Sequence, residues 1–209
     1  VPNPAYPIHA FGFIINGANL VHYNVNSGID LMKEISSKVE GSKKDIKAMI
    51  LNFPSNPTAE ICSLDFYKEI VPYAKKHNII LLSDLAYAEI YFDENEIPTS
   101  ILEVEGAKDI AVEFTSLSKS FSMPGWRMGF AVGNEYLISA LTRIKSYLDY
   151  GAFTPIQVAS AAALNSEQSI IDEIRNVYKG RRDVLVESFS RSGWDVPCPK
   201  ATMFAWSPL

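Results

Sequence analysis

Short apolar runs alternate with segments of helical periodicity along this chain, and this alternation limits the possible folds more than any other feature. The four runs cover residues 46–51, 79–82, 110–114 and 128–132. Runs of this length and composition are typical of strands that are buried on both faces of a sheet. Strands that alternate with helices form α/β domains. We therefore predict an α/β fold with a mostly parallel sheet.

The segments between and after these strands predict the helices. The expected helices cover residues 64–77, 135–147, 155–164 and 167–190. Ser63 is a suitable N-cap for the first of them, whereas Pro72 is expected to kink or interrupt it. Pro155 fits the first turn of an alanine-rich helix. The apolar residues 203–206 read as a further strand.

The composition excludes several classes of protein. The chain of 209 residues is 47% hydrophobic and 21% charged, with a net charge of −5. This balance predicts a globular domain and does not favour nucleic acid or an anionic membrane as a partner. No apolar stretch is long enough to span a membrane. Cys62 and Cys198 are too few for a disulfide framework and are expected as free thiols in a reducing compartment.

Motifs for metals and for nucleotides are not found in the sequence. His9, His22 and His77 are scattered, without the spacing or the neighbouring carboxylates of a metal site. No glycine-rich nucleotide-binding motif occurs. We therefore expect neither a metal nor a nucleotide.

The segment T-S-L-S-K-S-F-S-M-P-G-W-R-M-G, residues 115–129, carries the strongest chemical signal. Lys119 follows a predicted strand inside a run of hydroxyl residues, and Arg127 lies eight positions later. A lysine amine can form a Schiff base with a carbonyl compound. Hydroxyls together with an arginine can bind a phosphate. The segment therefore predicts a phosphorylated carbonyl cofactor joined to Lys119, and the alternative is a solvated polar loop.

A second polar cluster follows the neighbouring predicted strands, at the edge of a parallel sheet where ligands gather. Asp84 ends one strand and is followed by Tyr87, and Asn56 lies in a turn after another. Pyridoxal phosphate (PLP) needs an acidic partner for its pyridinium nitrogen, and Asp84 could supply it. Tyr87 and Asn56 could hydrogen-bond the phenolic oxygen of the ring. The alternatives are a capping or turn role for Asp84 and a turn role for Asn56.

Taken together and in this order, these motifs resemble the signature of fold-type I, PLP-dependent class I/II aminotransferases. The matching motifs are Asn56-Pro57-Thr58, Ser83-Asp84-Leu85-Ala86-Tyr87, Ser116-Leu117-Ser118-Lys119 and Pro124-Gly125-Trp126-Arg127-Met128-Gly129. The resemblance implies a three-layer α/β/α large domain. Residues 3–7, 149–157 and 198–204 look closest to alanine (glutamate–pyruvate) aminotransferases, with LL-diaminopimelate aminotransferases as near neighbours.

The resemblance also implies roles for the residues around the cofactor ring. Lys119 would form the Schiff base and then act as general base and acid at the substrate Cα. Asp84 would hold the pyridinium, and Tyr87 and Asn56 would bond the phenolic oxygen. Tyr6 would stack on the ring face, the alternative being a loop aromatic packed on the core.

The phosphate group is assigned to other residues by the same resemblance. Ser116 and Arg127 would bind it, with Ser118 as a weaker candidate. One departure concerns Ala59, because the family often has glycine after N-P-T. Alanine is expected to be tolerated there unless its φ is positive.

The resemblance implies a domain division as well. Residues 1–190 would be the PLP-binding large domain without its N-terminal part, and residues 191–209 would begin a truncated small domain. The arginine that binds the substrate carboxylate would then follow Leu209. Four arginines on or near the long C-terminal helix are expected to be solvated instead: Arg175, Arg181, Arg182 and Arg191.

The function implied is a cytoplasmic, homodimeric aminotransferase that moves an amino group from a small, alanine-type L-amino acid to a 2-oxo acid. The fragment alone is expected to be inactive. The alternatives are a PLP-dependent lyase or decarboxylase on the same fold, or a non-catalytic PLP-binding sensor module of a regulator. Ser116 and Lys119 also have the S-x-x-K spacing of serine β-lactamases, but no K-T-G follows.

Overall fold

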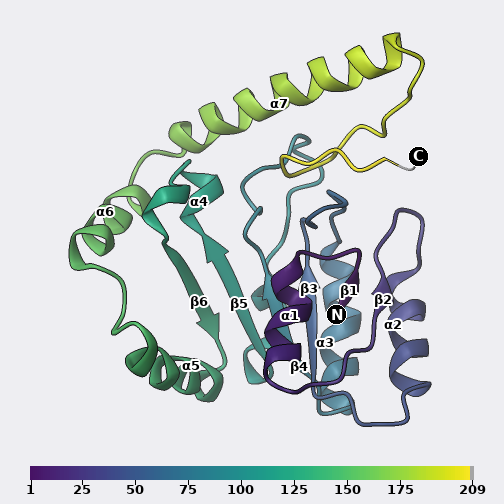
Figure 1. Cartoon of the computed structure of the whole chain (residues 1–209), viewed down its shortest axis with the longest axis vertical. Coiled ribbons are helices and arrows are strands. Elements are labelled where there is room, and N and C mark those ends of the chain that lie inside the picture. Colours follow the sequence, from purple (N-terminus) through teal and green to yellow (C-terminus); the bar gives the residue numbers. More distant parts are fainter. Residues whose placement is uncertain (208–209) are drawn as a thin grey trace.

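The four strands predicted from the short apolar runs form one sheet in the computed structural model, which describes residues 1–207 (Figure 1). The strands are β1 (Pro2–Asn3), β2 (Tyr23–Asn24), β3 (Ala48–Asn52), β4 (Ile80–Asp84), β5 (Ala111–Ser116) and β6 (Gly129–Gly133). The helices are α1 (Pro7–Ile15), α2 (Leu31–Glu40), α3 (Leu64–Lys76), α4 (Leu117–Ser120), α5 (Glu135–Leu148), α6 (Thr154–Leu164) and α7 (Gln168–Arg191). The α/β fold with a mostly parallel sheet is confirmed.

The sheet has the order β3-β4-β5-β6, and a separate pair is formed by β1 and β2. β3, β4 and β5 are parallel, so their carboxyl ends lie at one edge. Asn52 at the end of β3 is therefore the direct neighbour of Asp84 at the end of β4. β6 is antiparallel to β5, and Ser116 lies opposite Gly129. A Cβ atom at Gly129 would lie 2.7 Å from the Thr115 carbonyl oxygen, so this close approach of the strands requires glycine.

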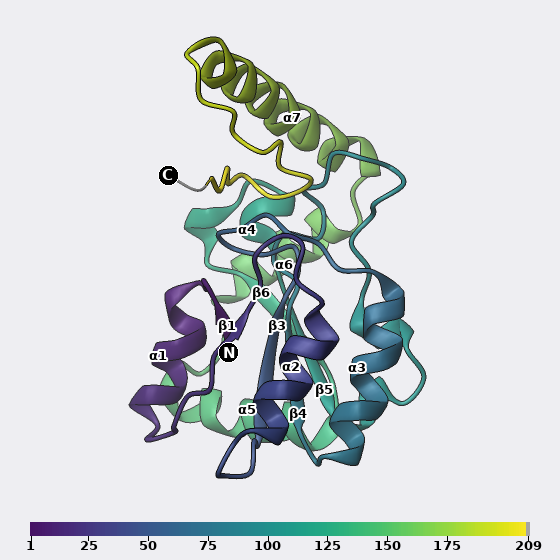
Figure 2. The same cartoon turned by 90° about the vertical axis from the view of Figure 1, so that its right-hand side faces the viewer.

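Helices cover both faces of the sheet. Figure 2 shows α1 on one side of the strands and α3 on the other. α3 packs against β4, and α2 packs against α3 and β2. The fully buried side chains of this core include Ile35, Leu51, Tyr67, Ile70 and Leu81. Burial of such side chains contributes about 1.5–3 kcal/mol each, which makes this face the main source of stability.

The cap that Ser63 was expected to provide is confirmed. Of the kink or break expected at Pro72, the break is wrong. The Ser63 side chain accepts a hydrogen bond from the Phe66 N–H at 3.2 Å. α3 then continues through Pro72 to Lys76 without interruption. Pro72 and Lys68 are both exposed, so the Lys68 carbonyl that loses its helical donor at Pro72 faces water. This solvent access explains why the proline is tolerated.

The strand expected at residues 203–206 does not form. The chain makes only an isolated bridge between Ala201 and Tyr91, and Thr202 then takes a left-handed conformation with φ 67°. A left-handed residue turns the chain out of line with a ladder. The Phe204 side chain makes a ring contact instead, with its centroid 5.5 Å from that of Tyr87.

α7 crosses above the carboxyl ends of the parallel strands, and the last described residues return alongside it (Figure 1). Two of its arginines contradict the expectation of a solvated face. The Arg175 side chain is only 10% exposed and lies against the ring of Tyr91, and Arg182 lies over Phe92. The expectation holds for Arg181 and Arg191, which are exposed. The first two differ because the segment after β4 packs on their side of the helix.

Cys62 and Cys198 are both free thiols, as expected, but their surroundings differ. Burial raises the pKa of Cys62 to about 12, whereas Cys198 is exposed. Because the thiolate is the reactive form, we predict that iodoacetamide at pH 8 alkylates Cys198 at least about 100-fold faster than Cys62. Peptide mass spectrometry over a time course measures both rates. In denaturant the two rates should become equal, and equal rates in the folded protein would contradict the raised pKa of Cys62.

Candidate active site

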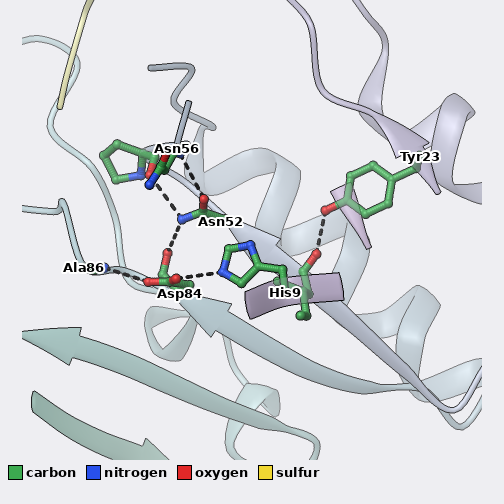
Figure 3. Close-up of polar contacts among 8 residues, drawn as sticks. His9, Tyr23, Asn52, Asn56, Asp84 and Ala86 are labelled. Atoms are coloured by element: carbon green, nitrogen blue, oxygen red, sulfur yellow. Dashed lines mark hydrogen bonds and ion pairs between the residues drawn. The ribbon is translucent and has the colours of Figure 1, made fainter. Parts of the chain in front are cut away.

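Asp84 is the centre of the polar cluster at the carboxyl edge of the sheet, and both of its carboxylate oxygens are held (Figure 3). The Nε2–H of His9, on α1, donates to Asp84 Oδ2 at 2.8 Å. The Ala86 N–H donates to Oδ1 at 3.1 Å. The carboxylate remains 25% exposed. Its orientation is therefore fixed while one side stays accessible to a ligand.

Asn52 connects the end of β3 to this carboxylate's strand (Figure 3). Its side-chain N–H₂ donates to the carbonyl oxygens of Asp84 at 3.1 Å and Pro54 at 3.3 Å. Its Oδ1 accepts from the Asn56 N–H at 3.0 Å. The turn that carries Asn56 is thus fastened to the end of β4. Sequence reasoning missed Asn52, because it reads as the last residue of a strand.

Ala59 closes the same turn in a left-handed conformation, with φ 59°. This is the positive φ at which alanine was not expected to be tolerated freely, because the left-handed region costs an L-residue with a side chain about 1–2 kcal/mol. Two backbone hydrogen bonds hold the turn, from Ala59 N–H to Ser55 O and from Ser55 N–H to Glu60 O. The buried methyl group offsets part of the cost.

The Tyr87 phenol lies beside Asn56, Asp84 and Tyr6. Burial, the negative charge of Asp84 and the nearby Tyr6 together raise the pKa of Tyr87 to about 12, against a side-chain hydrogen bond with Asn56 that lowers it. Tyr87 is therefore protonated at neutral pH and can donate a hydrogen bond. The Lys119 ammonium nitrogen lies 5.1 Å from the centroid of the Tyr87 ring. That distance is within the range of a cation–π contact.

Lys119 reaches this position because a short helix starts directly at the end of β5. Ser116 is the N-cap of α4, and its Oγ accepts from the Ser118 N–H at 3.2 Å. The Leu117 N–H donates to the Met128 carbonyl at 3.2 Å, which brings the segment of Arg127 close to α4. The Arg127 guanidinium itself donates to the Pro124 carbonyl at 2.8 Å, rather than to the serine hydroxyls.

Tyr6 lies at the start of α1, at the edge of the cluster. Its side chain is 46% exposed, so it is not a loop aromatic packed into the core. Its ring meets the His9 ring edge-on, with 5.8 Å between centroids. The structure therefore brings Tyr6, Asn56, Asp84, Tyr87 and Lys119 together, with Ser116 and Ser118 at the base of the lysine's helix.

His9 is a second site residue that sequence reasoning missed. It is buried, and its Nδ1 has no hydrogen-bond partner within the described residues 1–207. His9 and Asp84 are 75 residues apart, and no local pattern marks the histidine. Only the packing of α1 against the end of β4 pairs them.

A cavity of the described region lies away from this cluster. Its volume is about 490 Å³, and it is bordered by Phe13, Tyr23, Ile35 and Met49, with lysines at its rim. Its lining contains none of the residues of the polar cluster, so the candidate site is defined by its side chains. Within residues 1–207 there is no group of three metal-ligating side chains, and no helix long and apolar enough to cross a membrane.

The chain matches the family described as "Aminotransferase class I and II" over residues 1–209. It therefore belongs to the class I and II aminotransferases, whose cofactor is pyridoxal 5′-phosphate. The resemblance found in the sequence is confirmed.

Curated relatives of known name agree with this family. AatC of Rhizobium meliloti (strain 1021), an aminotransferase by name, is 60% identical over 208 residues, covering 100% of this chain and 51% of AatC. The glutamate-pyruvate aminotransferase AlaC of Escherichia coli (strain K12) is 49% identical, with 100% and 50% covered. An LL-diaminopimelate aminotransferase of Dehalococcoides mccartyi (strain CBDB1) is 42% identical, with 100% and 54% covered. The chain thus spans about half the length of these relatives.

Solved structures confirm the fold type. Apo-BacF from Bacillus subtilis superposes with a TM-score of 0.91 at 35% identity, covering 100% of this chain and 53% of the other. An aminotransferase from Staphylococcus aureus gives a TM-score of 0.87 at 30% identity, covering 99% and 54%. The three-layer architecture of PLP-dependent aminotransferases is therefore the fold of this chain.

The His9–Asp84 hydrogen bond leads to a stability prediction. We expect His9→Leu to lower the free energy of unfolding of the cofactor-free protein by about 2 kcal/mol, because a partly buried carboxylate loses its donor. His9→Gln is the matched control, since its amide can donate from about the same place and should recover at least half of the loss. Urea denaturation measures both variants. Equal losses would show that the hydrogen bond contributes nothing.

Proposed function

We propose that the protein carrying this chain is a PLP-dependent aminotransferase that moves an amino group from a small, alanine-type L-amino acid to a 2-oxo acid. The observation that carries the proposal is the convergence of Lys119, Asp84, Tyr87 and Asn56 at one edge of the sheet. Family membership supports the reaction type. The names of AatC, AlaC and the LL-diaminopimelate enzyme support an amino acid as the donor.

The residues present fit the cofactor by the chemistry of their donors and acceptors. Asp84 offers a fixed carboxylate for a protonated ring nitrogen, and Tyr87 offers a phenol that stays protonated at neutral pH. Asn56 would join Tyr87 at the phenolic oxygen, and Tyr6 would lie on the ring face. When bound, PLP supplies an electron-accepting ring that stabilises the negative charge left when a bond to the substrate Cα breaks.

Binding of the phosphate is assigned to the start of α4 and the loop before β6. Ser116 and Ser118 place two hydroxyls beside Lys119, and Arg127 lies one hairpin away. For Arg127 to take part, its guanidinium would exchange the Pro124 carbonyl for phosphate oxygens. A guanidinium binds phosphate more strongly than a neutral carbonyl, which favours this exchange.

Lys119 has two functions in this proposal. Its Nζ would hold the cofactor covalently until a substrate amine displaces it. The freed amine would then act as general base and acid for the proton of the substrate Cα. The adjacent Tyr87 ring keeps this amine near the reacting atoms.

The proposal extends to the whole protein. Residues 1–190 would form the PLP-binding large domain and residues 191–209 would begin the small domain. We propose a cytoplasmic homodimer, in line with the family, in which the parts absent from this chain bind the substrate carboxylate.

Covalent trapping tests the proposed lysine. Borohydride reduction of the PLP-loaded full-length protein should abolish its visible absorbance band and fix the cofactor to the peptide that contains Lys119. Peptide mass spectrometry locates the label. Lys119→Ala should show no label, whereas Lys108→Ala, a change of an exposed lysine, should be labelled as the parent is. A label on any other lysine would overturn the assignment.

Product analysis tests the reaction and the donor. We expect alanine to be the best donor among alanine, aspartate, phenylalanine and LL-diaminopimelate, with 2-oxoglutarate as acceptor, and by at least about 10-fold in kcat/KM. Each turnover should yield one keto acid and one new amino acid. Release of ammonia or carbon dioxide instead would identify a lyase or a decarboxylase. Preference for LL-diaminopimelate would overturn the alanine-type assignment alone.

A further inference from the structure

Arg175, on α7, is the most highly connected charged side chain outside the proposed cofactor site. Its Nε–H donates to the Glu89 carbonyl oxygen at 3.0 Å, and its Nη1 bonds Asp172 at 3.2 Å. Its Nη atoms also lie 3.6 Å from the Glu89 carboxylate and 3.7 Å from that of Glu94. The guanidinium carbon lies 3.8 Å from the centroid of the Tyr91 ring. A solvated arginine makes no such set of contacts.

These contacts fall on the segment that connects Asp84 and Tyr87 to the rest of the fold. Glu89 follows Tyr87 by two residues, and the Ile90 N–H donates to the Tyr87 carbonyl at 3.0 Å. The Leu85 N–H donates to the Phe114 carbonyl at 2.8 Å, which fixes the start of the segment to β5. The segment is thus attached to the sheet at Leu85, and Arg175 holds it at Glu89.

The segment is held from a second side by the last described residues. The Thr202 N–H donates to the Ile90 carbonyl at 2.7 Å, and the Phe92 N–H donates to the Lys200 carbonyl at 3.0 Å. Ile90 is fully buried between these partners. Residues 85–92, which we call the Tyr87 segment, thus lie between α7 and residues 200–202.

We propose that Arg175 is a positioning residue for Tyr87: its guanidinium clamps the Tyr87 segment to α7 and so fixes the phenol that faces the cofactor. The proposal rests on the proposed function for its catalytic consequence, while the clamp itself is a property of this chain. Lysine cannot replace arginine here, because it lacks the Nε–H that reaches the Glu89 carbonyl and the planar group that stacks on Tyr91.

The first test examines the clamp without cofactor. Arg175→Lys is compared with Arg181→Lys, a change of an exposed arginine on the same helix whose guanidinium lies 5.6 Å from the Tyr178 ring. Hydrogen exchange of the cofactor-free full-length protein should be about 10-fold faster in residues 85–92 for Arg175→Lys and unchanged for Arg181→Lys. Equal exchange in the two variants would overturn the proposal.

The second test examines the consequence for the loaded enzyme. In Arg175→Lys the pH midpoint of the cofactor's visible band should rise by about 0.5 unit. The reason is that the Tyr87 hydrogen bond to the phenolic oxygen, which favours the deprotonated form of the lysine-bound cofactor, is weakened. We expect kcat to fall about 10-fold with KM within about twofold, since ground-state binding is not the property lost. Faster exchange with an unchanged midpoint and kcat would show a purely structural clamp and overturn the positioning role.

A milder variant keeps the proposal testable if Arg175→Lys does not fold. Asp172→Asn leaves Arg175 in place and removes one charged acceptor, so it should change exchange and midpoint in the same directions by smaller amounts. No change in either would count against the clamp. If the parent protein forms no absorbing PLP complex at all, the proposed function fails, while the exchange comparison still decides whether Arg175 holds the segment.

Discussion

The parallel pairing of β3, β4 and β5 is the constraint on which the rest of the structure depends. It sets the register that puts Asn52 beside Asp84 and ends β5 at Ser116, so three polar strand ends share one edge. Without this register the turn of Asn56 and the helix of Lys119 would have no common position. The core beneath α2 and α3 stabilises the register, because a slip of one residue would turn buried side chains toward the wrong face.

At that edge, the negative charge of Asp84 is bonded by neighbouring groups and acts on others. His9 and the Ala86 N–H orient the Asp84 carboxylate, and that negative charge contributes to keeping the Tyr87 phenol protonated. Arg175 lies one layer further out and holds the backbone between these groups and α7. The cofactor site is thus the inner part of a larger polar arrangement that links the sheet to the long helix.

Local patterns in the sequence were sufficient for the strands, the cap at Ser63 and the residues with chemical signatures. Lys119, Asp84 and Tyr87 could be found because each follows an apolar strand in a recognisable motif. His9, Asn52 and the burial of Arg175 could not, because each depends on a partner far away in the chain. The predictions of a break at Pro72 and of a strand at residues 203–206 failed for a related reason. Solvent access at Pro72 and the absence of a neighbouring strand beside residues 203–206 are properties of the folded chain rather than of the segment.

Because β6 is antiparallel to β5, the chain runs away from the polar edge of the sheet along β6. β6 starts at the edge that holds Lys119 and ends at the opposite edge. The chain must therefore return to the first edge before α7 can cross above the strand ends. α5 and α6 provide this return path, and neither contributes a residue to the polar cluster described above. The connection between β5 and β6 carries both Lys119 and Arg127, whereas about 48 residues, including α5 and α6, separate Arg127 from Arg175. Residues near the polar edge of the sheet are therefore supplied once by the connection directly after β5 and once by α7, after the long return through α5 and α6.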